Sequence, residues 1–309
     1  MAGSGEAGLR PVREEELEEV RERLARQLPH SIVVHGAVSL AKRYGLHTLR
    51  PASILVPACP QPSCLTVITN PTSSAMQTLV VFWNPEEDTA RDVMDQLSRL
   101  AVLDWSQPVH FIAIPTALLD SIEAVGSVGS QRVRYSRQYP VHIYTLQTAR
   151  TQDEGLPPEY VMASLKGSDA TTVWTRWSLN AFDSLASTKH IITSFPSVGV
   201  YKREPSEPHQ TKQSTNNPGS LEEGAERTLV SWTLLFKLGW IGHTFTLPQH
   251  RRRGLARAAT QALARQLQFE GLLPYVLLWV GNDKSIKLHE GLGFRRQCEV
   301  HVLLAEPDQ

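Results

Sequence analysis

The sequence has few of the features that assign many chains to a class at once. It has three cysteines in 309 residues, Cys59, Cys64 and Cys298, and so sparse and odd a set is typical of reduced thiols, not of a disulfide framework. Cys59 and Cys64 flank a Pro-Gln-Pro loop that has no second ligand pair nearby. We therefore predict neither a zinc site nor a redox site, and no bound metal.

An excess of charge of one sign and long apolar runs are also missing. Lysine plus arginine and aspartate plus glutamate number 31 each, so no global field favours nucleic acid or an acidic membrane, and any anion site must be local. No stretch approaches ~18 consecutive apolar residues, so no membrane span is expected. The N-terminal segment lacks the apolar core of a secretory signal and is too rich in glutamate for a typical mitochondrial presequence. We expect an intracellular, cytoplasmic protein.

The composition is that of a folded globular protein. Hydrophobic residues make up 41% and charged residues 20% of the chain, so disorder is not expected overall. The length suggests about two domains. The polar, proline-paired stretch 151–158 suits a linker between a first domain, 1–150, and a second domain, 159–309. Within the second domain, residues 202–227 have the composition of a flexible loop.

Periodicity and turn residues predict mixed α/β structure in both halves. Helices are expected at 14–28, 88–103, 116–125, 178–189, 255–269 and 282–290. Strands are expected at 65–69, 78–83, 109–114, 191–201, 229–236, 240–246, 274–280 and 299–304, with one or two more within 133–146. Residues 31–42 fit either a helix or a strand.

The most informative segment runs from Thr246 to Ala256, between an apolar strand pattern and a helical pattern. Pro248 ends the strand, Gly254 lets the backbone come close to a ligand, and the small side chain of Ala256 keeps the first helical turn uncrowded. N–H groups at the start of a helix face outward and carry the positive end of its dipole. The segment is therefore typical of a phosphate-binding turn.

Three arginines in this turn also favour an anion site. Arg251, Arg252 and Arg253 stand where cations oppose the helix dipole, so the cluster is unfavourable unless an anion is bound there. A solvated surface cluster is the alternative interpretation. The segment lacks the Gly-Lys-Ser/Thr ending of a Walker loop and the three-glycine spacing of a dinucleotide site.

Strand, Pro-x-x-Arg-x-x-Gly-x-Ala turn, helix and strand, followed by Asn282 and Gly293-Phe294, resemble the Gcn5-related N-acetyltransferase superfamily. The resemblance narrows to the glycine N-acyltransferases and covers nearly the whole chain. The segments that carry it are Leu28-Pro29-His30-Ser31 with Val33 and Gly36, Trp105, Phe195-Pro196, Ser231-Trp232 and Thr246-Leu247-Pro248.

This resemblance implies an α/β (α+β) fold of two acyltransferase-like domains, each a mixed, mostly antiparallel sheet flanked by helices. It implies that the first domain is degenerate and that the second moves an acyl group from coenzyme A to the amine of glycine or a related amino acid. Acyl-CoA would be a co-substrate, with no permanently bound cofactor. It also implies a mitochondrial location, in contrast to the N-terminal sequence.

The same resemblance distributes the chemistry over the second domain. The thioester carbonyl would lie beside the end of the strand, where a free backbone N–H of Phe245, Thr246 or Leu247 polarises it. Asn282 would hydrogen-bond the pantetheine or simply cap the following helix. The diphosphate would be held by the turn, through Arg251, Arg252, Arg253, Gly254, Leu255 and Ala256.

Proton transfer is the step for which the sequence departs from the family. His289 stands where many superfamily members have the tyrosine that protonates the departing thiolate; a surface histidine late in a helix is the alternative. The family's catalytic glutamate falls eight residues before the Thr-Leu-Pro proline, where this chain has Trp240. His243 is the nearest titratable substitute, although two-residue alternation predicts that it points to the opposite face. His250, Glu290 and a water chain are weaker candidates.

Three functions follow from these residues. The first is an acyl-CoA:amino acid N-acyltransferase, acting on acyl-CoA and a small amine such as glycine. The second is a catalytically impaired acyl-CoA-binding or interaction protein, suggested by Trp240. The third is acetylation of protein or peptide amines, which shares the motif. Nucleic-acid and membrane partners are not expected, and the sequence does not predict an oligomeric state.

Overall fold

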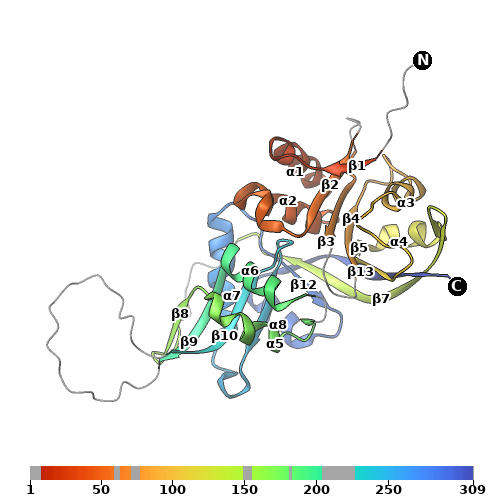
Figure 1. Cartoon of the computed structure of the whole chain (residues 1–309). Coiled ribbons are helices and arrows are strands. Elements are labelled where there is room, and N and C mark those ends of the chain that lie inside the picture. The colour runs from red at the N-terminus through yellow and green to blue at the C-terminus, as the bar shows by residue number, and fades with distance from the viewer. Residues whose placement is uncertain are drawn as a thin grey trace, which may run out of the picture.

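Figure 1 shows the chain as a computed structural model, which describes residues 8–58, 63–70, 77–148, 155–180, 183–203 and 227–308. The predicted loop 202–227 and the Cys59 loop lie largely outside these residues, as does the start of the predicted linker. Cys64 and Cys298 are free thiols. In the described part of the chain, no helix has the length and apolarity to cross a bilayer.

The first half of the chain alternates strands and helices. Its elements are β1 (Leu9–Pro11), α1 (Leu17–Ala25), α2 (Ile32–Tyr44), β2 (Ser53–Pro57), β3 (Thr66–Asn70), β4 (Gln77–Phe82), α3 (Ala90–Ser98), β5 (Val109–Pro115), α4 (Thr116–Glu123), β6 (Ser127–Val128) and β7 (Gln131–Thr145). The ambiguous segment 31–42 is helical. Its apolar residues are buried on nearly all sides, which suits a helix packed between other elements.

The second half continues the alternation. Its elements are β8 (Tyr160–Ala163), α5 (Ala170–Arg176), α6 (Leu185–Ser194), β9 (Ser197–Arg203), β10 (Arg227–Leu235), β11 (Ile241–Thr246), α7 (Leu255–Phe269), β12 (Tyr275–Trp279), α8 (Asp283–Leu292) and β13 (Arg295–Pro307).

One boundary in this half differs from the prediction. Residues 178–184 precede the helix α6, and Ile191 to Ser194 belong to that helix and not to the expected strand. The side chain of Ser184 caps α6 by accepting a hydrogen bond from the N–H of Ser187, and Ile191 and Ile192 are buried on its inner face. Capping and burial together outweigh the strand preference of β-branched residues.

The strands form two sheets. A nine-stranded sheet has the order β1-β2-β3-β4-β5-β13-β7-β12, with β6 paired to β7, and a four-stranded antiparallel sheet has the order β11-β10-β9-β8. Among the strands of the described residues, only the β4–β5 pair is parallel. The mixed, mostly antiparallel sheets flanked by helices confirm the predicted fold class.

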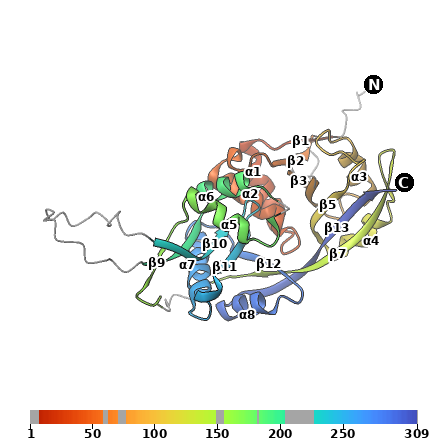
Figure 2. The same ribbon diagram turned by 60° about the horizontal axis from the view of Figure 1, so that its bottom comes forward.

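The two halves share the larger sheet. The C-terminal strand β13 lies between β5 and β7, and β7 pairs with β12 along its other edge, through Val141 to Thr145 (Figure 2). Helix α2 also reaches across: a Cβ on Gly36 would lie 2.5 Å from the Tyr275 hydroxyl oxygen, so only glycine allows this approach of α2 to β12. The division at 151–158 stays a prediction about the chain's organisation.

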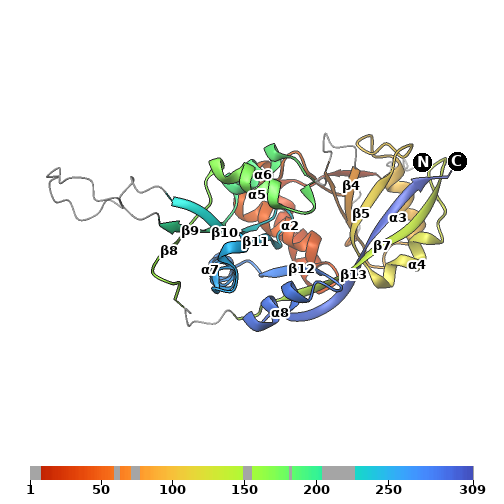
Figure 3. The same cartoon turned by 90° about the horizontal axis from the view of Figure 1, so that it is seen from below.

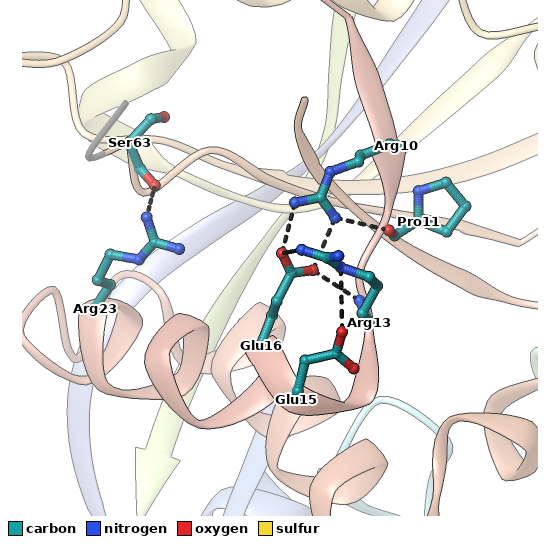
Figure 4. A network of polar contacts seen from close by, with 7 residues as sticks. All are labelled: Arg10, Pro11, Arg13, Glu15, Glu16, Arg23 and Ser63. Atoms are coloured by element: carbon teal, nitrogen blue, oxygen red, sulfur yellow. Dashed lines mark hydrogen bonds and ion pairs between the residues drawn. The ribbon is translucent and has the colours of Figure 1, made fainter. Parts of the chain in front are cut away.

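Buried side chains form two clusters on opposite faces of the larger sheet. One lies beneath α3 and α4, and the other joins α1 and α2 to the second half of the chain. At the N-terminal edge, Arg10 and Arg13 both donate to the carboxylate of Glu16, which ties β1 to the start of α1 (Figure 4). These hydrogen bonds hold the pKa of Glu16 well below its usual range.

Candidate active site

The site lies where the two sheets meet without pairing. Strands β11 and β12 run side by side but are edge strands of different sheets, so the backbone groups on their facing edges make no ladder with each other (Figure 3). A cavity of about 500 Å³ opens beside them. Its walls come from both halves of the chain, and its volume is in the range of small-molecule sites.

A β-bulge distorts β11 at the cavity. Trp232 pairs with Phe245 and Leu234 pairs with Gly242, so two residues of β11, His243 and Thr244, stand opposite one residue of β10. His243 adopts φ 53, in the left-handed region that side-chain-bearing residues rarely occupy. The bulge therefore shifts the alternation of side chains along β11 and so changes which of them face the cavity.

The hydrogen bonds of β11 identify the N–H group that faces β12. Leu247 donates its N–H to the carbonyl of Val230, so this group is not free to polarise a ligand. Phe245 lies two residues earlier, opposite Trp232, and by alternation its N–H also points to β10. Of the three predicted donors, Thr246 is the one whose N–H points toward β12.

The turn that was predicted to bind phosphate has a left-handed glycine at the start of α7, as expected from the sequence. Gly254, with φ 75, precedes α7 as its N-cap and offers no side chain to the first-turn N–H groups; this turn has no acidic residue. Leu255 and Ala256 form the first turn of the helix. Arg252 in the same turn is exposed and adopts φ 64, which is in the left-handed region. A helix N-terminus of this kind has donor groups available for an anion.

The flanking arginines are held in different ways. The Nε of Arg251 donates to the carbonyl of Thr246 at 3.1 Å, and its guanidinium lies 5.7 Å from the ring centroid of Phe245. Arg253 forms an ion pair with Glu159 at 3.4 Å. The guanidinium of Arg251 is thus held at the end of β11, whereas that of Arg253 is held next to β8 at the other edge of the smaller sheet.

Asn282 caps α8. Its Oδ1 accepts a hydrogen bond from the N–H of Ser285 at 3.3 Å, which confirms the capping alternative. The residue also lines the cavity. A hydrogen bond to pantetheine therefore stays a prediction.

His289 is buried beside the cavity, on α8. Its Nδ1 lies 2.8 Å from the carbonyl oxygen of Ser285, and because a carbonyl can only accept, Nδ1 carries the proton and Nε2 is left with a lone pair. Burial lowers the pKa of His289. A neutral imidazole of this tautomer accepts a proton in its resting state, whereas the predicted role was proton donation.

His243 lies in a row of aromatic rings. Its ring stacks on Trp177, with centroids 4.0 Å apart, and lies 5.6 Å from Phe236, which stacks on Trp240 at 4.5 Å. The prediction that His243 points away from Trp240 is wrong, because Trp240 belongs to the turn before β11 and the bulge breaks the alternation. Burial lowers the pKa of His243 to about 4.

The two weaker base candidates are placed elsewhere. The Nδ1 of His250 lies 2.9 Å from the hydroxyl of Tyr160, and Glu290 accepts a hydrogen bond from Tyr144 at 3.3 Å. Neither residue is part of the cavity lining. Their contacts connect secondary-structure elements and do not face the opening.

Several wall residues have no signature in the local sequence. Lys237 lines the cavity and forms a buried ion pair with Asp183, with Nζ and Oδ2 3.1 Å apart. The first half of the chain contributes one face of its sheet, through Ile68, Thr78, Val80, His110, Ile112, Gln138, Tyr139 and Val141. Alternating apolar residues could have marked these strands as two-faced, but not which partner covers each face.

The described residues contain no group of three or more His, Cys, Asp or Glu that could hold a metal ion. The groups that the cavity offers to a ligand are therefore backbone donors, imidazoles, two cationic side chains and apolar walls. These groups suit an elongated ligand with an anionic end at the turn and an apolar part inside.

Comparison with known proteins agrees with this geometry. Residues 219–302 match the family model described as FR47-like protein. A Drosophila protein solved by a structural-genomics consortium is 15% identical, with a TM-score of 0.72 over 98% of this chain and 100% of that one. A tandem Gcn5-related N-acetyltransferase from the clavulanic acid biosynthesis pathway is 12% identical, with a TM-score of 0.54 over 98% and 100%.

A third similar structure is a putative acetyltransferase from Pyrococcus horikoshii, 8% identical, with a TM-score of 0.54 over 100% of this chain and 92% of that one. At such low identity these likenesses define the fold. The chain therefore shares its fold with these proteins, one of which is a tandem Gcn5-related N-acetyltransferase.

Proposed function

We propose that the protein is an acyl-CoA:amino acid N-acyltransferase that moves an acyl group from coenzyme A to the amine of glycine or a related amino acid. The observation that carries the proposal is the unpaired edge of β11, which leads directly into the uncapped, arginine-rich start of α7. An extended pantetheine can add to such an edge while the diphosphate binds at the helix N-terminus.

The chain's own residues supply binding and polarisation. N–H groups of Leu255 and Ala256, with the adjacent arginines, hold the diphosphate. The N–H of Thr246 donates to the thioester oxygen and stabilises the negative charge that develops when the amine attacks. Asn282 stands at the other side of the opening, within the cavity lining.

Aminolysis also moves protons. The ammonium of the acceptor must lose one proton before its nitrogen can attack and a second as the amide forms, and the departing thiolate must gain one; the other proton goes to a basic group or to solvent. No carboxylate stands among the described residues that line the cavity. Trp240, which lines it, stands where the resemblance to the glycine N-acyltransferases implies the catalytic glutamate. We assign proton acceptance to the neutral imidazoles of His243 and His289, and positioning of the amine contributes the rest of the rate.

The test is direct. Purified protein is incubated with benzoyl-, phenylacetyl- or fatty acyl-CoA and a panel of amino acids, and free thiol is followed together with the acylated product. We expect thiol release that depends on both substrates and saturates with acyl-CoA. Absence of turnover with every pair, in protein that still binds acyl-CoA, would exclude catalysis of this reaction.

A second candidate function is acyl-CoA binding without efficient catalysis. Trp240 favours it, because its stack on Phe236 puts a non-basic ring where the family has its base. In that case acyl-CoA raises the melting temperature while thiol release stays at the uncatalysed rate. Trp240→Glu then increases the rate, by up to about 100-fold for a gained general base, whereas Trp240→Gln does not.

A further inference from the structure

The charge of the cavity lining is unbalanced. Its histidines, His110, His243 and His289, all have pKa values lowered by burial and are neutral near pH 7. Lys237 is neutralised by Asp183 from behind the wall. No aspartate or glutamate is present among the described lining residues, so the charge that remains is the guanidinium of Arg176.

Arg176 stands at a fixed point of that wall. It is the last residue of α5, and the next residue, Trp177, stacks on His243 and donates its N–H to the carbonyl of Trp174. The indole of Trp174 in turn donates to the carbonyl of Asp183 at 3.2 Å. The backbone that carries Arg176 is therefore anchored on both sides, while its own side chain is exposed at the cavity.

We propose that Arg176 binds the carboxylate of the acceptor and thereby selects amines that carry a carboxylate. This assignment rests on the proposed transfer to an amine. A guanidinium forms two parallel hydrogen bonds with a carboxylate, which fixes both the position and the direction of a small molecule. An amino acid held at that end presents its amine to the interior of the cavity, toward β11.

The contact contributes to binding and orientation and takes no part in bond making. It is formed in the ground state and in the transition state alike, so its loss raises the KM for the acceptor more than it lowers kcat. An acceptor without a carboxylate gains nothing from Arg176. The difference between the two kinds of acceptor is therefore the signature of this role.

The experiment compares glycine with glycinamide in the wild type, Arg176→Ala and Arg176→Lys, with Arg91→Ala as control. Arg91 is exposed on α3, on the other side of the larger sheet. We expect Arg176→Ala to raise the KM for glycine about 10- to 100-fold and to leave that for glycinamide within about twofold. Arg176→Lys recovers part of the loss, and Arg91→Ala changes neither value.

A binding arm keeps the inference testable if turnover fails. N-Benzoylglycine and its amide, as product analogues, are titrated calorimetrically into the same variants in the presence of coenzyme A. A loss of affinity on Arg176→Ala that is confined to the carboxylate supports the assignment even without catalysis. Equal effects on acid and amide, or no effect on either, overturn it, whereas absent turnover with intact discrimination counts only against the proposed function.

Discussion

Both halves contain a strand–turn–helix arrangement, but its surroundings differ between them. In the first half, β4 leads to α3 and pairs in parallel with β5, through Gln77↔Val109 and the next two residue pairs. In the second half, β11 leads to α7 but does not pair with β12, which pairs with β7 instead. The face of β4 and β5 beneath α3 is filled by buried side chains such as Leu79 and Phe111. A cavity opens beside β11, and the opposite face of β4 and β5 forms part of its wall.

The helix starts differ in the same sense. The Thr89 side chain caps α3 by accepting from the N–H of Asp92, and the preceding turn carries Glu86, Glu87 and Asp88. Helix α7 begins at Gly254, without a side-chain cap and after three arginines. At the start of α3 a side chain takes up a first-turn N–H group and the acidic residues repel anions. At the start of α7 no side chain caps the first-turn N–H groups, so they are available to an anion. The same arrangement of strand and helix therefore occurs twice in this fold, and strand pairing and helix capping decide which of the two can bind an anionic ligand.

The largest effect on stability is expected from the buried ion pair of Lys237 with Asp183 at the wall of the cavity. Asp183→Asn leaves Lys237 without its countercharge, so the free energy of unfolding falls by about 3–5 kcal/mol. Urea denaturation followed by tryptophan fluorescence measures it. The matched control is Asp120→Asn, which breaks the exposed pair with Arg137 in the first half and costs less than about 1 kcal/mol. Equal losses would contradict the inference.

The next effect is a dependence of stability on pH. Burial lowers the pKa of His243 from 6.5 to about 4, so between these values the unfolded chain binds more protons than the native one. The contribution is complete above pH 6.5 and is lost as pH falls toward 4, by about 3 kcal/mol. Unfolding midpoints measured across this window test it.

His243→Phe keeps an aromatic ring in the stack and removes the titration, so the slope of stability against pH becomes shallower. His35 in α2 of the first half has its pKa lowered to about 4 by the same cause, so His35→Phe gives a matched comparison between the halves. A slope unchanged by His243→Phe would show that its ring is solvated in the native state.

A third prediction removes the difference between the two helix starts. Gly254→Asp places a carboxylate at the N-cap of α7, where it takes up the first-turn N–H groups and repels the diphosphate, so affinity for coenzyme A falls about 10- to 100-fold. Gly254→Asn is the control, because asparagine tolerates a positive φ and adds no charge. Calorimetric titration gives both affinities. Affinities that stay at the wild-type value in both variants would locate the diphosphate elsewhere.

How much of this could be read from the sequence depends on the range of each interaction. The helix α7 and the turn before it were predicted correctly, because glycine, proline and a strong helical period act within a few residues. The geometry at His243 was not, because a bulge depends on the register with β10 and not on local residue type. The tautomer of His289 depends on one contact with Ser285 and was equally hidden.

The wall from the first half was the least predictable feature. Strand β13, near the C-terminal end, pairs with β5 and β7 of the first half of the chain, and a single sequence contains no signal for so distant a pairing. Asp183 and Lys237 likewise meet only after α6 and the β10–β11 turn pack together. The turn before α7 could be predicted from the sequence, but the residues that form the wall of the cavity could not.

The smallest expected effect comes from reversing a charge in the first half. Glu86→Arg gives the turn before α3 a cation, yet the Thr89 cap and the β4–β5 pairing remain, so we expect no second coenzyme A site. Titration should give one equivalent per chain, as in the wild type, and stability should change by no more than about 0.5 kcal/mol because the side chain is exposed. A second equivalent would show that charge alone opens the site, and that capping and pairing do not separate the two halves.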